Sequence, residues 1–117
     1  MSIITTNNNG IVKSQTITGN TTILELTGEI EMNCVMQLRE AVMEAMQESK
    51  IVVLNMTEVK FMDSSGLATM VETLQQSKRQ DKQLKIAGLN QRVKSIFEIS
   101  RLETVFDIYD TEKEALA

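Results

Sequence analysis

The strongest constraint on the fold of this chain is a continuous apolar run at residues 51–54, Ile51-Val52-Val53-Leu54. β-branched side chains favour extended backbone. A strand that is apolar at consecutive positions carries apolar side chains on both faces, so both faces must be covered. The run therefore predicts a strand between Lys50 and Met56, in a sheet that is packed by helices.

Two weaker strands precede this run. Alternating patterns from Ile11 to Thr18 and from Thr22 to Thr27 flank the turn residues Gly19-Asn20, and Gly28 follows the second pattern. This arrangement is typical of a β-hairpin. Residues 1–10 end in Asn7-Asn8-Asn9-Gly10, whose turn chemistry indicates a flexible N-terminus.

Helical and extended segments alternate in the remainder of the chain. Apolar residues recur at helical spacing in three segments, and short apolar runs separate them. Thr111 and Glu114 form a capping box before a short C-terminal helix. The expected helices begin near Asn33, Ser64 and Asn90, a loop is expected at Thr57–Asp63, and the expected strands are Leu84–Ala87 and Val105–Ile108.

This order of elements predicts the fold class. Strands that alternate with helices form crossover connections and a parallel sheet. The predicted fold is therefore α/β, with a mixed, mainly parallel sheet that starts with an N-terminal hairpin and is packed by about four helices. With 117 residues, of which 42% are apolar, the chain suits a single domain, expected at residues 11–117.

Composition argues against several functions. The net charge is −4, Lys and Arg are scattered, and aromatic residues make up 3% without Trp, so nucleic-acid binding is not expected. Cys34 is the single cysteine, which excludes an internal disulfide and is interpreted as a small apolar filler. There is no signal-peptide pattern and no apolar run of membrane-spanning length, so we expect a cytoplasmic protein without direct membrane insertion.

The segment Asp63-Ser64-Ser65-Gly66 lies where the central strand passes into a helix. Asp and Ser at such a junction accept hydrogen bonds from free helical N–H groups. Gly66 permits a tight approach of the chain. Helix capping alone is therefore one interpretation of this segment, and a chemical role for one of its hydroxyls is the other.

Enzymatic roles for these hydroxyls lack their partners. The chain has no histidine, so a Ser-His-Asp triad is impossible, and a serine–lysine pair would need a lysine where Leu67 and Ala68 stand. No P-loop and no pair of cysteines occurs, so neither a nucleotide, a metal nor another cofactor is expected. A receiver domain would need an aspartate where the central strand ends in Asn55 and Met56. We therefore expect no catalytic residue and no enzyme activity.

Phosphorylation by a partner kinase remains as a chemical role. A phosphate at a helix N-terminus meets free N–H groups and the positive end of the helix dipole, so the fold tolerates it. The phosphate adds about two negative charges beside Asp63. Like-charge repulsion and desolvation would then act on any partner docked over this segment.

Three segments, in order along residues 11–115, resemble the STAS domain family, in particular the bacterial anti-sigma factor antagonists. The segments are Leu26–Ile30, which is similar to the second-strand signature, Val59–Leu67, which is similar to the phosphorylation loop, and Arg92–Leu102, which is similar to the third-helix segment. The resemblance implies partner switching. In this family the unphosphorylated antagonist binds an anti-sigma factor that is itself a serine kinase of the GHKL type. The kinase releases the antagonist by phosphorylating it, and a metal-dependent serine phosphatase reverses the reaction.

The resemblance also implies roles for individual residues. Ser64 stands at the acceptor position, and Ser65, at the second hydroxyl position, is a second candidate for modification. Asp63 and Gly66 are expected to support the phosphorylation loop. One departure concerns the loop near it, where the family usually has Asp and this chain has Glu31. The expected partner-binding residues around this loop are Glu31, Ser65 and Leu67.

Two methionines on the first predicted helix add a surface hypothesis. Met36 and Met43 lie about a quarter-turn from the apolar stripe of that helix. They either widen its core face or form an exposed patch that extends the docking surface beside Ser64. The stripe itself consists of Val35, Leu38, Val42, Ala45 and Met46.

Two other functions remain open at this point. Some STAS proteins are non-catalytic docking subunits of lipid-transport ABC systems or stress-sensing assemblies, which need no acceptor cycle. The intact hydroxyls of Ser64 and Ser65 favour a phosphoswitch over that alternative. A weak nucleotide-binding domain comes third, because no loop in the sequence supports it.

Overall fold

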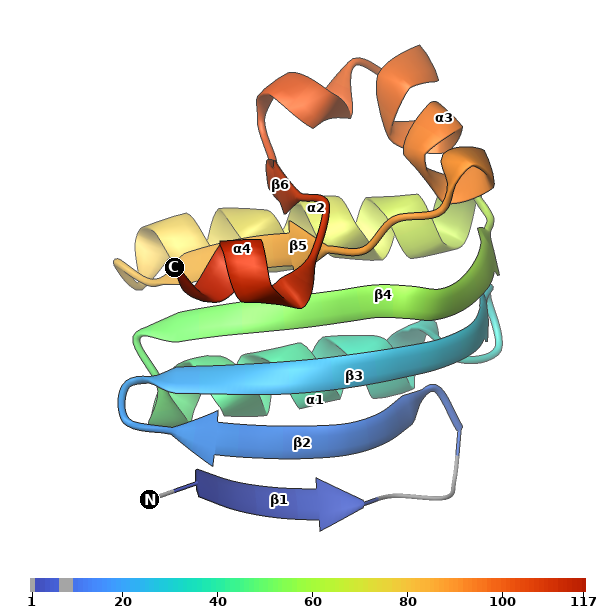
Figure 1. Ribbon diagram of the computed structural model, residues 1–117. Coiled ribbons are helices and arrows are strands. Elements are labelled where there is room, and N and C mark those ends of the chain that lie inside the picture. Colours follow the sequence, from blue (N-terminus) through green and yellow to red (C-terminus); the bar gives the residue numbers. More distant parts are fainter. Residues whose placement is uncertain (1, 7–9) are drawn as a thin grey trace.

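The computed structural model describes residues 2–6 and 10–117. Its strands and helices alternate after an N-terminal meander, as Figure 1 shows. The strands are β1 (Ser2–Thr6), β2 (Val12–Thr18), β3 (Thr21–Ile30), β4 (Ile51–Met62), β5 (Gln83–Ala87) and β6 (Asp107–Tyr109). The helices are α1 (Val35–Glu48), α2 (Ser64–Arg79), α3 (Gln91–Ile99) and α4 (Glu112–Leu116), with a short 3-10 helix, η1 (Leu102–Thr104), before β6.

The strands of the described residues form one sheet in chain order, from β1 at one edge to β6 at the other. β2 pairs antiparallel with both β1 and β3, and the pairs from β3 to β6 are parallel. Figure 1 shows α1 and α2 on one face of the sheet and α4 on the other. The predicted α/β class, the mainly parallel sheet and the hairpin of β2 and β3 are therefore confirmed.

β4 lies inside the sheet and is covered on both faces, as its apolar run predicts. Val52 and Leu54 are fully buried in the main core. Val53 points to the other face, where it packs with Ala87 of β5 and with Ala115 of α4. The short C-terminal helix is thus the cover that the second apolar face of β4 requires.

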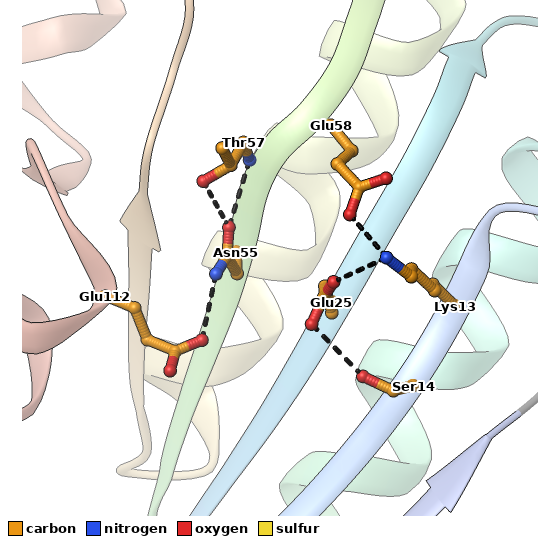
Figure 2. A network of polar contacts seen from close by, with 7 residues as sticks. All are labelled: Lys13, Ser14, Glu25, Asn55, Thr57, Glu58 and Glu112. Atoms are coloured by element: carbon orange, nitrogen blue, oxygen red, sulfur yellow. Dashed lines mark hydrogen bonds and ion pairs between the residues drawn. The ribbon is translucent and has the colours of Figure 1, made fainter.

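Polar contacts tie the strands together on the face that carries α4 (Figure 2). Lys13 Nζ lies 2.6 Å from Glu58 Oε2 and 3.3 Å from Glu25 Oε1, so one cation joins β2, β3 and β4. Hydrogen bonds raise the pKa of Lys13, and the bond to Glu58 contributes more than the bond to Glu25. Asn55 Nδ2 donates to Glu112 Oε1 at 2.9 Å and holds α4 against β4. These partly exposed groups fix strand register and add little stability.

β4 is longer than the sequence predicts. The expected loop at Thr57–Asp63 is wrong, because the strand continues to Met62 and stays paired with β3 up to Ile30. Irregular register between Glu25 and Thr27, and between Gly28 and Glu29, disturbs the alternation of buried and exposed positions. An irregular period of this kind hides a strand from pattern analysis.

The second half of β4 extends beyond β5, whose pairing with β4 ends at Asn55. The start of α3 contacts this part of the strand instead. Asn90 Nδ2 donates to the Val59 carbonyl at 2.9 Å, and the Arg92 guanidinium lies 4.9 Å from the centre of the Phe61 ring. These two contacts place the N-terminus of α3 near the carboxyl end of β4, where α2 also starts (Figure 1).

Other predicted boundaries also differ. Ser2–Thr6 forms β1 and pairs with β2, where residues 1–10 are expected to be flexible, and the Asn triplet lies outside the described residues. Cys34 rather than Asn33 is the N-cap of α1, and it makes no side-chain cap bond. β6 begins at Asp107 because Val105 lies in the turn after η1 and is 49% exposed.

The predicted caps of α3 and α4 are confirmed. Asn90 Oδ1 accepts a hydrogen bond from the Val93 amide at 2.8 Å. Thr111 Oγ1 accepts one from the Glu114 amide at 3.2 Å. Both side chains satisfy helical N–H groups that have no partner within the helix.

Arg101, between α3 and η1, has a left-handed backbone with φ of 61°. This region costs a residue with a Cβ atom about 1–2 kcal/mol, and glycine avoids the cost. We expect Arg101→Gly to raise the free energy of unfolding by about 0.5–1 kcal/mol, after the greater entropy of glycine in the unfolded chain is subtracted. Urea denaturation measures the change. Arg101→Ala keeps the Cβ atom and is the control, so an equal gain from alanine would contradict the conformational explanation.

Candidate functional site

The segment Asp63 to Gly66, called here the serine segment, joins β4 to α2. Asp63 has extended backbone and is the N-cap of α2. Its amide donates to the Ile30 carbonyl at 3.1 Å, so the segment is attached to the end of β3. The carboxyl ends of β3 and β4 and the N-terminus of α2 therefore meet at one end of the strands.

Gly66 lets the first turn of α2 lie against β3. It is buried, and a Cβ atom placed on it would lie 2.8 Å from the Ile30 carbonyl oxygen and 2.7 Å from Met62 Cγ. Distances this short do not occur in real structures without displacement of the neighbours. The geometry supports the predicted role of Gly66 as a residue that supports the loop.

The Asp63 carboxylate is held by donors of the first turn of α2. Its Oδ1 accepts a hydrogen bond from Ser65 Oγ at 2.6 Å and another from the Gly66 amide at 2.9 Å. The backbone amides of Met32 and Ser65 make smaller contributions to its lowered pKa. The bonds from the Ser65 hydroxyl and the Gly66 amide are the main causes that lower the pKa of Asp63. Asp63 is therefore ionised near neutral pH and acts only as an acceptor.

The two serines of the segment have different environments. Ser64 is exposed, and among the described residues its hydroxyl has no hydrogen-bond partner. Ser65 is half-buried, and its hydroxyl donates to Asp63. The sequence presents two equivalent hydroxyls, whereas the structure leaves only the first of this pair accessible and unpaired.

The turn Glu31 to Cys34, called here the methionine turn, lies against the serine segment. The Cys34 amide donates to the Glu31 carbonyl at 2.9 Å, and Cys34 Sγ accepts from the Glu31 amide at 3.3 Å. Met32 is 75% exposed. Cys34 also packs against the core, which fits its interpretation as a filler.

A polar groove of about 550 Å³ borders the methionine turn. Glu31 and Cys34 line it from the turn, and Lys60 lines it from β4. Glu31 is half-buried, so its carboxylate is partly accessible. The residue that departs from the family pattern thus lies on an accessible surface beside the serine segment.

The structure separates the two methionines of α1. Met36 is 64% exposed, whereas Met43 is partly buried and packs against the core. Leu67 is also partly buried against the core. Arg39 Nε on α1 lies 2.7 Å from Glu72 Oε1 on α2, so the two helices are neighbours and the Met36 surface continues toward α2. Sequence analysis does not identify Met32, because an apolar residue in a turn has no periodic pattern.

The described residues lack the groups for two other kinds of site. Within them, no three His, Cys, Asp or Glu side chains lie close enough together to hold a metal ion. None of the helices in this part of the chain has both the length and the apolar character of a membrane span. The most distinctive polar chemistry is therefore that of the serine segment and the methionine turn.

Comparison with protein families gives a match to the STAS domain over residues 13–115. The chain belongs to the STAS domain family. Its sequence is 31% identical over 93 residues to the anti-sigma-B factor antagonist of Staphylococcus aureus, which covers 78% of this chain and 86% of the relative. The STAS fold and the resemblance to anti-sigma factor antagonists, predicted from three sequence segments, are therefore confirmed.

Solved structures agree with this STAS assignment. An anti-sigma factor antagonist from Mycobacterium paratuberculosis superposes with a TM-score of 0.78 at 19% identity, covering 97% of this chain and 92% of that one. The phosphorylated form of the Bacillus cell fate determinant SpoIIAA superposes with a TM-score of 0.67 at 22% identity, covering 86% and 91%. At these identities the likeness establishes the fold of this STAS domain and nothing finer.

Proposed function

We propose that this STAS domain is an anti-sigma factor antagonist that switches partners through phosphorylation of Ser64. In its unphosphorylated state it binds an anti-sigma factor, and phosphorylation releases it. The observation that carries the proposal is the exposed, unpaired Ser64 hydroxyl at the first turn of α2, beside a Ser65 hydroxyl that is already bonded. The relatives named as anti-sigma-B factor antagonists support the same function.

The partner supplies the catalysis in this proposal. An anti-sigma factor that is a serine kinase of the GHKL type transfers the γ-phosphoryl group of ATP to Ser64 Oγ, and ADP leaves. The hydroxyl proton passes to a base of the kinase, because the lowered pKa of Asp63 makes its carboxylate a weak base. A metal-dependent serine phosphatase removes the phosphate. This STAS domain itself is not an enzyme and acts in the cytoplasm, where sigma factors act.

The docking surface for the partner surrounds Ser64. We define the docking face as Met32, Met36 and Ser64, which are all exposed at the starts of α1 and α2. Exposed methionines adapt to a partner surface. Glu31, in the groove beside this face, is placed to meet a cationic group of the partner. The docking face is supported by three partly buried residues behind it: Ser65, which bonds to Asp63, and Leu67 and Met43, which pack against the core.

A pair of methionine substitutions tests this surface. We expect Met36→Asp to weaken partner binding by about tenfold or more, because the new aspartate places an unpaired charge in the interface that must be desolvated. Stability should change little, because Met36 is exposed. Met43→Asp is expected to lower the free energy of unfolding by about 2 kcal/mol or more, because Met43 packs against the core. Calorimetric titration and urea denaturation separate the two effects. Unchanged binding by Met36→Asp would remove Met36 from the docking face.

Phosphate mapping tests the proposed function. The Ser64→Ala variant is used as bait to capture the partner kinase, which is then incubated with ATP and the wild type, Ser64→Ala or Ser65→Ala. We expect one phosphate on the wild type and on Ser65→Ala, located at Ser64 by peptide mass spectrometry, and none on Ser64→Ala. Phosphate on Ser65, or no captured kinase, would contradict the proposal and favour a docking subunit without an acceptor cycle.

A further inference from the structure

The two outer strands of the sheet, β1 and β6, differ in length and charge (Figure 1). β6 is three residues long and begins with the charged residue Asp107. A short edge strand with a charge is protected against pairing with another chain. β1 is five residues long and contains neither a charged residue nor a proline. The edge formed by β1 therefore lacks the features by which edge strands avoid such pairing.

The backbone of β1 is also regular. Its antiparallel pairing with β2 is uninterrupted along all five residues, whereas the pairs of β2 with β3 and of β3 with β4 contain irregular register. A bulge in an edge strand would twist the edge away from a partner. Four of the five residues are β-branched and favour extended backbone. β1 is thus a regular template for a further strand.

β1 offers backbone hydrogen-bonding groups to that further strand. In an antiparallel ladder, alternate residues exchange N–H and C=O bonds with the neighbouring strand, and the residues between them direct these groups to the other side. Because β1 is the last strand on its side, its outward groups meet no further strand among the described residues. An added strand would satisfy them through main-chain bonds, as in recognition by β-strand addition.

The sequence of β1 favours an identical strand as the added one. A charged strand would gain no ion pair from β1, whereas a second copy of β1 is equally uncharged and equally regular. Antiparallel pairing about Ile4 places this residue opposite Ile4 of the second copy. Ser2 then lies opposite Thr6. Ile3 lies opposite Thr5, so that both of these pairs contain a β-branched residue with a high strand propensity.

We propose that two copies of this chain associate through β1, which pairs antiparallel with β1 of the second copy about a two-fold axis at Ile4. The two sheets then form one continuous sheet, with α1 and α2 of both copies on the same face. β3 runs parallel to β1, because β2 is antiparallel to both. The carboxyl ends of β3 in the two copies therefore point in opposite directions, and the two serine segments lie at opposite ends of the sheet.

This association does not depend on the proposed switch at Ser64. The family match starts at residue 13, so β1 lies outside the matched part of the chain. β2 and β3 separate β1 from β4, the strand that leads into the serine segment. A five-residue strand buries a small interface, so the association is weak and depends on protein concentration.

Sedimentation equilibrium over a range of concentrations tests the proposal. We expect the average mass of the wild type to rise from that of one chain toward that of two. Ile4→Lys and Ile4→Glu should each weaken association by about tenfold or more, because like charges then lie opposite each other. An equimolar mixture of the two variants should associate again, because opposite charges meet. Gln80→Lys, at an exposed position after α2, is the matched control and should associate as the wild type does.

Amide hydrogen exchange identifies the surface in the same samples. Exchange at alternate residues of β1 should slow as the protein concentration rises, and exchange in β6 should stay constant. A wild type that remains monomeric up to millimolar concentration would overturn the proposal, as would association that persists unchanged in both Ile4 variants. If the mixture of folded variants, checked by circular dichroism, stays monomeric, Ile4 does not lie opposite its own copy and the two-fold pairing is wrong.

Discussion

Ser64→Asp is expected to bind the anti-sigma factor about a hundredfold more weakly than Ser64→Ala. Ser64 is exposed and its hydroxyl has no partner in the described residues, so alanine removes no contact that the fold uses. Aspartate instead places a second carboxylate beside the ionised Asp63, on a face that carries the exposed Met32 and Met36. Desolvating an unpaired charge in an interface costs a few kcal/mol, and about 2.8 kcal/mol corresponds to a hundredfold change in Kd.

Ser64→Asn is the matched control for this experiment, because asparagine has nearly the shape of aspartate without its charge. We expect Ser64→Asn to bind nearly as well as Ser64→Ala in calorimetric titrations with the captured partner. Equal weakness of the asparagine and aspartate variants would show that size, not charge, controls binding. Thermal denaturation should show Ser64→Asp to be as stable as the wild type or slightly more so, because a carboxylate is favourable at a helix N-terminus.

The central features of the fold follow from the sequence because they depend on local patterns. The run at residues 51–54 requires cover on both faces, and α4 provides the second cover through Ala115. The hairpin of β2 and β3 follows from the turn at residues 19–20. Asn90 and Thr111 cap helices as their side chains predict.

The errors arise where tertiary contacts override those patterns. The second half of β4 lacks a regular alternation, because its register with β3 shifts twice. Asn33 does not cap α1, because Cys34 occupies the N-cap and the turn before it is closed by contacts of Cys34 Sγ. The register of β3 with β4 joins residues far apart in the sequence, and the contacts of Cys34 Sγ are local but not periodic, so no periodicity reveals either.

The candidate site shows the same division. The sequence identifies the serine segment from its residue types and its place between a strand and a helix. Residue type and spacing do not rank Ser64 above Ser65, because adjacent residues of one type differ only in the direction of their side chains; that ranking came from the family resemblance alone. The sequence cannot separate Met36 from Met43 either, since both lie at the border of the apolar stripe. The exposure of one member of each pair required the structure.

Gly66→Ala is expected to lower the free energy of unfolding by about 2–3 kcal/mol. Helix propensity alone would favour alanine at this position by about 1 kcal/mol. The new Cβ atom, however, would lie 2.8 Å from the Ile30 carbonyl oxygen and 2.8 Å from Ile30 Cγ2. Ile30 is paired with Met62, and its carbonyl accepts a hydrogen bond from the Asp63 amide, so its backbone is not free to move away. Overpacking against fixed backbone outweighs the propensity term.

Ala68→Gly in the same helix separates these two contributions, because Ala68 is exposed and meets only the propensity cost. Urea denaturation should show Ala68→Gly to be less stable by about 1 kcal/mol and Gly66→Ala to be less stable still. A gain in stability from Gly66→Ala would mean that the first turn of α2 does not press against β3. The consequence for function follows from the same contact. The displacement that a Cβ atom forces on this turn moves Ser64 and Asp63 together, so Gly66→Ala should weaken partner binding even under conditions in which the variant is fully folded.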